Sequence, residues 1–211
     1  MSAAMDGDSW PPSAGERLAL LDVQTLIRRQ LGGDAADIHI AQTDALLAEP
    51  RFHDRLLRLL AGDAGDLPAV DAPGDRLLLR ATDAQLAGLR RACGVVCQAQ
   101  AFARAIQAPQ VQALNERFGR PLCALALRHR ALAWSSTEQD DPDLLEVLVE
   151  TDGAACLAAW FATLPASLQH WMRLRGLEAG GAVDDDYRDR RVALVRAVAV
   201  DWLAAPAGEA A

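Results

Sequence analysis

The sequence contains no lysine, so arginine supplies all of its 21 basic side chains. That absence excludes the chemistries that need lysine: the phosphate-binding lysine of P-loops, the Schiff base and the lysine of the protein-kinase site. The 29 acidic residues leave a net charge of −8, and no basic stripe is interleaved with aromatic residues. An acidic surface repels phosphate groups, so we expect neither nucleic acid nor an anionic membrane as a partner.

Cysteine and long apolar runs are also scarce. Four cysteines in 211 residues are too few for a disulfide-rich secreted scaffold, so we expect reduced thiols. The first eight residues are acidic and lack the basic and apolar segments of a signal peptide. No stretch reaches the roughly 18–20 apolar residues of a membrane-spanning helix. The nearest such stretch, over residues 154–166, contains Pro165. These absences predict a cytoplasmic protein.

Aromatic residues make up only 5% of the chain, whereas alanine, leucine and arginine are abundant. These three residues are strong helix formers, while β-branched residues are sparse and form no long alternating run. About half of the residues (51%) are apolar, which is enough for a sizeable core. We therefore predict an all-α fold, an irregular multi-helix bundle of about eight helices with no significant sheet.

Composition also divides the chain into segments. We expect a disordered lead over residues 1–14 and a disordered tail over residues 206–211. Residues 15–75 are expected to form an N-terminal helical subdomain, which ends in a linker rich in glycine, proline and aspartate over residues 62–75. The main helical body is expected over residues 76–205.

Helix start signals are clearest in the main body. Thr82 and Gln85 match a capping box, in which the threonine hydroxyl accepts from the backbone N–H of the glutamine. Apolar residues then recur at helical spacing as far as Ile106, which predicts one amphipathic helix with Gln98 on its polar side. The Asp141-Pro142 pair predicts another helix start, and a last helix is expected over residues 184–203.

One acidic run offers a candidate for chemistry. Asp185, Asp186 and Asp189 match the Asp-Asp-x-x-Asp pattern with which all-α isoprenoid synthases hold Mg²⁺ and diphosphate, and carboxylates at this spacing can share a hard cation. The more favoured interpretation is that residues 184–189 begin a helix, because acidic side chains complement its positive N-terminal dipole. The second acidic cluster, over residues 140–143, lies at a loop-to-helix junction. A Mg²⁺-dependent isoprenoid-type enzyme is therefore the alternative function.

No other pattern indicates a reaction centre. Cys93 and Cys97 lie one helical turn apart, but no Cys or His pair with suitable spacing completes the four ligands of a zinc site, so core thiols are the favoured interpretation. The histidines are scattered along the chain: His39, His53, His129 and His170. We expect no catalytic residue, no metal site and no cofactor, and we predict that the protein is not an enzyme.

Tryptophan is the residue type that points to partners. Tryptophans at helical spacing are most often core residues, with a role as binding anchors as the alternative because Trp is enriched at binding hot spots. Trp10 differs, since it lies beside Pro11 in a segment with no obvious core, and is a plausible docking element. The candidate partner-binding residues are Trp10, Trp134 and Trp171.

Two segments resemble the SctK family of bacterial type III secretion, which includes YscK, PscK and the Hrp counterpart of plant pathogens. The first is RRACGVVCQAQAFARAIQAPQVQALNERFG, residues 90–119. It is similar to the family's long helix, short break and second amphipathic helix. The second is CLAAWFATLPASLQHWMRLRGL, residues 156–177. It is similar to the family's Leu-Ala-rich helix, proline break and tryptophan followed by basic residues. The N-terminus lacks the Arg-Phe-Cys-Pro segment of members from animal pathogens, which points to the Hrp-type branch or to another divergent branch.

The resemblance implies a non-enzymatic cytoplasmic component of the injectisome sorting platform, at the inner-membrane face of the secretion apparatus. Family members connect the cytoplasmic domain of the inner-membrane ring protein SctD to the pod protein SctQ, which leads to SctL and the ATPase SctN. A helical secretion chaperone, which would form a dimer with an apolar groove, is a further alternative.

Overall fold

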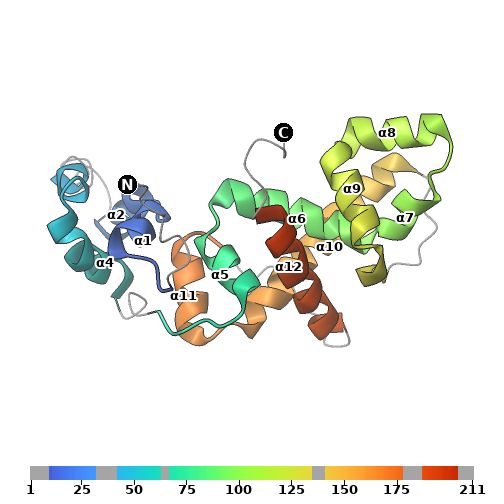
Figure 1. Ribbon diagram of the computed structural model, residues 1–211. Coiled ribbons are helices and arrows are strands. Elements are labelled where there is room, and N and C mark those ends of the chain that lie inside the picture. Colours follow the sequence, from blue (N-terminus) through green and yellow to red (C-terminus); the bar gives the residue numbers. More distant parts are fainter. Residues whose placement is uncertain (1–9, 32–41, 63–66, 135–140, 178–186, 204–211) are drawn as a thin grey trace, which may run out of the picture. The chain divides into compact units, whose positions relative to one another are not determined.

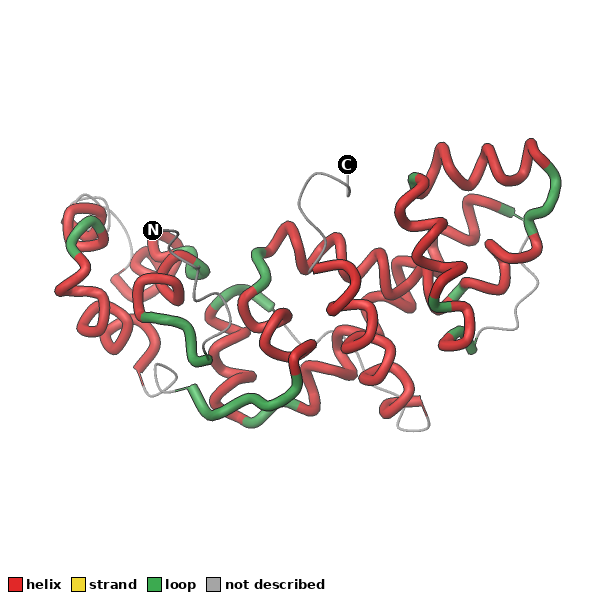
Figure 2. Tube along the Cα trace, in the orientation of Figure 1, coloured by secondary structure: helices red, strands yellow, loops and turns green. Residues whose placement is uncertain are grey.

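The computed structural model describes residues 10–31, 42–62, 67–134, 141–177 and 187–203, without the side chains of residues 29–31. Every regular element in these ranges is a helix (Figures 1 and 2). The all-α prediction is therefore confirmed for this part of the chain. The helices are shorter and more numerous than the sequence pattern predicts, because several expected helices are divided by a break.

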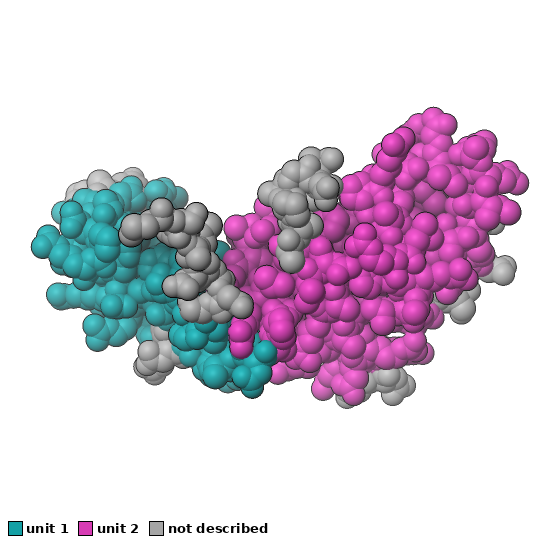
Figure 3. Space-filling view, in the orientation of Figure 1, with its two compact units in different colours: residues 1–71, 164–178 teal, residues 72–163, 179–211 magenta. Residues whose placement is uncertain are grey.

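The chain divides into two compact units, coloured separately in Figure 3. Unit 1 comprises Met1–Asp71 and Leu164–Glu178, and unit 2 comprises Ala72–Thr163 and Ala179–Ala211. The first change of unit falls inside the Gly/Pro/Asp-rich segment 62–75. The chain then enters unit 1 a second time after residue 163.

Unit 1 is built from short helices. Its α-helices with defined bounds are α1 (Ala14–Ala19), α2 (Val23–Leu31), α4 (His53–Ala61) and α11 (Ala166–Leu174), and a 3₁₀ turn, η1 (Pro50–Phe52), precedes α4. Residues 42–47 are also helical. Helix α2 starts separately from α1 because Asp22 caps it, its carboxylate accepting from the Thr25 backbone N–H at 3.0 Å. Helices α1 and α4 pack together and bury leucines from both.

Unit 2 is organised around two long helices that lie side by side, α6 (Asp83–Cys97) and α10 (Pro142–Thr163) (Figure 1). Helix α12 (Arg188–Leu203) packs on both of them, and α5 (Pro73–Arg80) packs on α12. The predicted capping box is present at the start of α6, where the Gln85 side chain also accepts from the Thr82 N–H at 2.8 Å. Helix α5 begins with proline inside the segment that the sequence predicts as linker.

Two glycines bring the backbones of α6 and α10 together. A Cβ atom on Gly94 would collide with the Val149 carbonyl oxygen of α10, and a Cβ atom on Gly153 would collide with the Arg90 carbonyl oxygen of α6. Each helix therefore places a glycine against the backbone of the other. Gly94, Gly153 and Val149 are buried, and this close approach sets the distance between the two helices.

A buried carboxylate connects three helices of the same unit. Asp75 on α5 is 7% exposed, and its side chain accepts from Trp160 Nε1 on α10 at 2.9 Å. Arg196 on α12 donates to both carboxylate oxygens, from Nε at 2.9 Å and from Nη2 at 2.8 Å. These donors stabilise the charge of the buried carboxylate. An isolated carboxylate at this depth would be strongly unfavourable.

The expected long helix through Ile106 is wrong in one respect. Helix α6 ends at Cys97, and α7 (Ala99–Arg104) follows after a break at Gln98. Gln98 is buried rather than on the polar side, because its side-chain amide donates to Asp152 Oδ2 at 2.6 Å. Ile106 lies beyond α7 and is 85% exposed, so it does not belong to the apolar face. The pattern missed the break because no glycine or proline marks it.

Candidate functional site

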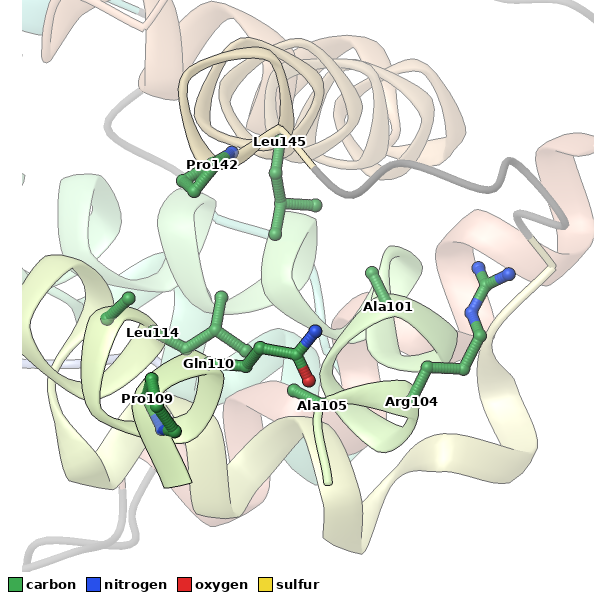
Figure 4. Close-up of a pocket in the computed structure, with 9 residues that line it drawn as sticks. Ala101, Arg104, Ala105, Pro109, Gln110, Leu114, Pro142 and Leu145 are labelled. Atoms are coloured by element: carbon green, nitrogen blue, oxygen red, sulfur yellow. The ribbon is translucent and has the colours of Figure 1, made fainter. Parts of the chain in front are cut away.

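A groove with a volume of about 300 Å³ lies among α7, α8 (Ala108–Phe118) and the first turns of α10. We call it the α8 groove. Its lining residues are Ala101, Arg104, Ala105, Pro109, Gln110, Ala113, Leu114, Pro142 and Leu145. In Figure 4, Pro142 and Leu145 of α10 lie on one side of the opening, and the residues of α7 and α8 lie across from them. All nine residues belong to unit 2.

The groove stays open because α8 is anchored mainly at its C-terminal end. Phe118, the last residue of α8, is its one buried residue, and it packs edge-on against Phe102 of α7 with the ring centroids 5.2 Å apart. The preceding turns of α8 contact α9 (Arg120–Arg128) and otherwise expose their side chains. The small side chains of Ala101, Ala105 and Ala113 leave the space that forms the groove.

A network of ion pairs holds the anchored end of α8 to α10 and α6. The Arg117 guanidinium lies 2.6 Å from Asp143 Oδ1 and 2.7 Å from Glu146 Oε2. Arg91 of α6 reaches the other oxygen of Glu146 at 3.0 Å, and its guanidinium also covers the Phe118 ring at 5.5 Å. The hydrogen bond from Arg117 lowers the pKa of the Glu146 carboxyl below its usual value.

The net charge of one stretch of the sequence differs from that of the chain as a whole. Residues 98–134, which include α7, α8, α9 and the 3₁₀ turn η3 (Arg130–Leu132), contain five arginines and one glutamate, a net charge of +4. The whole chain carries −8. We call this stretch the basic segment. Arg104 lines the groove, and Arg120 and Arg130 are exposed. Two of the five arginines are already paired, Arg117 with Asp143 and Glu146 of α10 and Arg128 with Asp201 of α12, so carboxylates of other helices offset part of this charge.

The three candidate tryptophans lie in different environments. Trp10 is half-buried in unit 1, and its Nε1 donates to the Pro68 carbonyl oxygen at 2.7 Å. Trp171 on α11 is 1% exposed, so its indole is a core side chain, which is the more common role of a tryptophan at helical spacing. Trp134 in unit 2 is partly exposed, and the Arg190 guanidinium lies 5.9 Å from its ring centroid. None of the three lines the α8 groove, and their roles in partner binding stay predictions.

The acidic residues with a predicted Mg²⁺ role are placed only in part. Asp185 and Asp186 lie outside the described residues, and Asp189 is exposed in the first turn of α12. In the second cluster, Asp141 accepts from the Asp143 backbone N–H at 2.9 Å, as a helix cap does, and Asp143 pairs with Arg117. Within the described ranges, no group of three His, Cys, Asp or Glu side chains could hold a metal ion.

The cysteines are free thiols, as predicted. Cys93, Cys97 and Cys156 are buried where α6 packs on α10, and the sulfur atoms of Cys97 and Cys156 lie 3.5 Å apart. Burial raises the pKa of the Cys93 thiol well above its ordinary value, which disfavours the reactive thiolate. Cys123 on α9 is only partly buried. The Cys93–Cys97 pair is therefore part of the core.

Unit 1 has a hollow of its own, with a volume of about 410 Å³, between α1, the start of α2 and the region around His53. The His53 ring hydrogen-bonds with the Leu47 carbonyl oxygen through Nε2 at 2.9 Å. Asp22 and Asp44 also line it, but Asp22 is already engaged by Thr25 at the start of α2.

No helix in the described parts of the chain is long and apolar enough to cross a membrane.

Comparison with known proteins gives a partial likeness. No protein-family model matches the sequence. No solved structure matches it either. The chain is similar to the nodulation protein NolU of Rhizobium fredii and to that of Sinorhizobium fredii (strain NBRC 101917 / NGR234). Each is 32% identical over 135 residues, which are 64% of this chain and 61% of the relative. The chain thus spans about three fifths of the length of the curated relatives it matches.

Proposed function

We propose that this chain is a non-enzymatic adaptor in the sorting platform of a bacterial type III secretion system. In this role it links the cytoplasmic domain of the inner-membrane ring protein SctD to the pod protein SctQ, and through SctQ to SctL and the ATPase SctN. It acts at the cytoplasmic face of the inner membrane. The similarity to a nodulation protein supports a role in a plant-associated bacterium, which agrees with the Hrp-type branch of the SctK family.

One observation carries the proposal. The segment over residues 90–119, which resembles the SctK family, forms the second half of α6, all of α7 and all of α8. These elements build most of the α8 groove and half of the basic segment. The part of the chain with the family likeness is therefore the part with an exposed apolar groove. An adaptor needs such a surface on a well-packed body, whereas an enzyme needs convergent reactive groups.

Co-purification from the same genome tests the proposal. The full chain is expected to bind SctQ and the cytoplasmic domain of SctD with dissociation constants of about 10 µM or tighter, corresponding to roughly −7 kcal/mol. SctL is the internal control, because the proposal connects it only through SctQ. It is expected to co-purify only when SctQ is present. Absence of binding to both SctQ and SctD at about 100 µM would contradict the adaptor role.

The Mg²⁺-dependent alternative requires both acidic clusters to face one cavity. Asp141 and Asp143 are used as a helix cap and an ion-pair partner, so no contact of these two residues favours that alternative. The chaperone alternative requires a dimer, which light scattering on the purified chain would detect.

A further inference from the structure

We propose that Cys97 and Cys156 form a redox-sensitive pair, in which hydrogen peroxide oxidises the two thiols to a disulfide that joins α6 to α10. This inference goes beyond the proposed function and does not depend on it. It has three supports: the distance between the two sulfur atoms, the glycine contact beside them, and the position of Cys97 at the end of α6.

The two sulfur atoms are already in contact. The Sγ atoms of Cys97 and Cys156 lie 3.5 Å apart, and both side chains are fully buried. The sulfur atoms of a disulfide are about 2.0 Å apart. The pair must therefore move closer to form the bond, but no other side chain has to leave the space between the two atoms.

The glycines at the crossing of α6 and α10 account for this contact. Cys97 lies three residues after Gly94, and Cys156 lies three residues after Gly153. Residues three apart in a helix share a face, so each cysteine lies on the face that its glycine presents to the other helix. The glycines bring the two backbones together, and a disulfide needs close backbones, because its Cα atoms are at most about 7 Å apart.

The position of Cys97 gives the bond a structural consequence. Cys97 is the last residue of α6, directly before the break at Gln98 that leads into α7. A bond to Cys156 would attach this end of α6 to α10. The two cysteines are 59 residues apart in the sequence, so the bond would also restrict the unfolded chain and thereby stabilise unit 2.

The reaction is a two-electron oxidation of the thiols. One cysteine sulfur, as the thiolate, attacks an oxygen of hydrogen peroxide, the O–O bond breaks, and the products are a sulfenic acid and, with the thiol proton, one water. The second sulfur then attacks the sulfenic sulfur, the S–S bond forms, and the S–OH group leaves as a second water with the proton of the second thiol. The peroxide is reduced to two waters, and a dithiol such as dithiothreitol reverses the oxidation.

Burial controls how fast this reaction proceeds. The contact with Cys156, together with burial, raises the pKa of the Cys97 thiol, so the reactive thiolate is scarce in the closed structure. The sulfur atoms react when α6 and α10 open locally. Hydrogen peroxide suits such a site because it is small and uncharged. We therefore expect oxidation that is slow but confined to this pair.

Mass spectrometry of the full chain tests the pairing. The folded chain is treated with hydrogen peroxide, its remaining thiols are blocked with iodoacetamide, and it is digested with trypsin. Because the chain has no lysine, trypsin cleaves only after arginine and yields peptides 92–104, with Cys93 and Cys97, and 131–173, with Cys156. These two peptides are expected to be cross-linked at least about tenfold more than any other cysteine pair. Dithiothreitol is expected to separate them.

Variants identify the sulfur in peptide 92–104. Cys97→Ala is expected to lower the yield of the cross-link by about tenfold or more, whereas Cys93→Ala is expected to retain it. Cys93 is the matched control because it is also a buried cysteine of α6. Circular dichroism verifies that both variants are folded. Fragmentation of the cross-linked peptide from the unaltered chain assigns the same sulfur without any substitution.

Thermal unfolding tests the consequence of the bond. The oxidised chain is expected to melt several degrees above the reduced chain, and dithiothreitol is expected to return Tm to its original value. Cys123→Ala is the control for other oxidation, because this thiol is only partly buried and donates to the Leu114 carbonyl oxygen at 3.6 Å. This variant should show the same rise in Tm as the unaltered chain.

Three outcomes would overturn the inference: no cross-link in the folded chain, an equal yield of cross-link in Cys97→Ala, or an oxidised chain whose Tm is unchanged or lower. None of these measurements involves a partner protein. Failure of the adaptor role would leave them unchanged, and their failure would leave the adaptor role unchanged.

Discussion

Asp75 combines a buried charge with partners that lie far away in the sequence. Trp160 is 85 residues away and Arg196 is 121 residues away, yet both donate to the Asp75 carboxylate. No local pattern in the sequence relates these residues, since a helix start such as Pro73-Gly74-Asp75 predicts only that the carboxylate favours the first turn. Local reasoning found the capping box at Thr82 but could not find this cluster, because its partners are set by tertiary packing.

We predict that Asp75→Ala lowers the free energy of unfolding by about 1–3 kcal/mol, because it leaves the buried Trp160 N–H without an acceptor, whereas the half-exposed Arg196 guanidinium can be solvated. Urea unfolding followed by circular dichroism measures this. Glu49→Ala is the matched control, since its ion pair with Arg51 spans 3.6 Å between exposed side chains and is expected to contribute less than about 0.5 kcal/mol. Equal effects of the two substitutions would contradict a special role for Asp75.

Asp152 differs from Asp75, because its charged form is expected to lower the stability of the folded state. Desolvation is the main cause that raises the pKa of its carboxyl above the usual value, although Gln98 donates to it. Because the folded state holds this proton more tightly than the unfolded state, the charged form costs stability once the pH rises above the raised pKa. We predict that Asp152→Asn, which can still accept from Gln98, raises Tm at pH 7. The gain is expected to shrink as the pH falls toward 4.

Melting curves of the Asp152→Asn variant and the unaltered chain at a series of pH values test this sign. Asp201→Asn serves as the comparison, because its hydrogen bond with His129 lowers the pKa of the Asp201 carboxyl. That variant should lose stability at pH 7 and approach the unaltered chain as the pH falls below about 4. A lower Tm of Asp152→Asn at pH 7 would refute the account of Asp152.

At the scale of elements, the contact between α6 and α10 is the one that the whole of unit 2 depends on. Gly94→Ala and Gly153→Ala each force a methyl group onto a carbonyl oxygen of the facing helix. We predict that either substitution lowers the free energy of unfolding by about 3 kcal/mol or prevents folding, because the helices must separate. Gly88 lies in α6, as Gly94 does. A Cβ atom at Gly88 would lie 3.3 Å from Trp202 Nε1, a side-chain contact that can adjust, so Gly88→Ala should lower the free energy of unfolding much less.

Thermal unfolding of the three glycine variants distinguishes packing from helix propensity. Alanine is a better helix former than glycine by about 1 kcal/mol, so propensity alone would make all three variants more stable. A gain in stability of Gly94→Ala or Gly153→Ala would show that the close approach of α6 and α10 is wrong.

Helix type was easier to predict than helix limits. The apolar spacing after Thr82 predicts a helix, and α6 is that helix, but the spacing continues across the break at Gln98 into α7. At the break, the Gln98 side chain is buried and donates to Asp152, a residue 54 positions away. Helix α5 was missed for the opposite reason: the prolines and glycines of segment 62–75 indicate a linker, although Pro73 suits the first turn of a helix.

At the scale of the whole molecule, the two units are interleaved in sequence. Leu164–Glu178 belongs to unit 1, although the residues on both sides of it belong to unit 2. Composition places a boundary in segment 62–75 but has no signal for this second entry into unit 1, since Pro165 marks only a helix end. The groove was equally hidden, because its lining residues come from three helices.

The adaptor account assigns different parts of unit 2 to different tasks. The core of α6, α10 and α12 supplies a stable body, while α7 and α8 form most of the groove. Hydrogen–deuterium exchange on the full chain, with and without SctQ and the cytoplasmic domain of SctD, tests this most directly. We predict that one of the two proteins slows exchange in residues 99–118, with little change in the already protected centre of α6. The absence of any added protection in residues 99–118 with either protein would contradict the account.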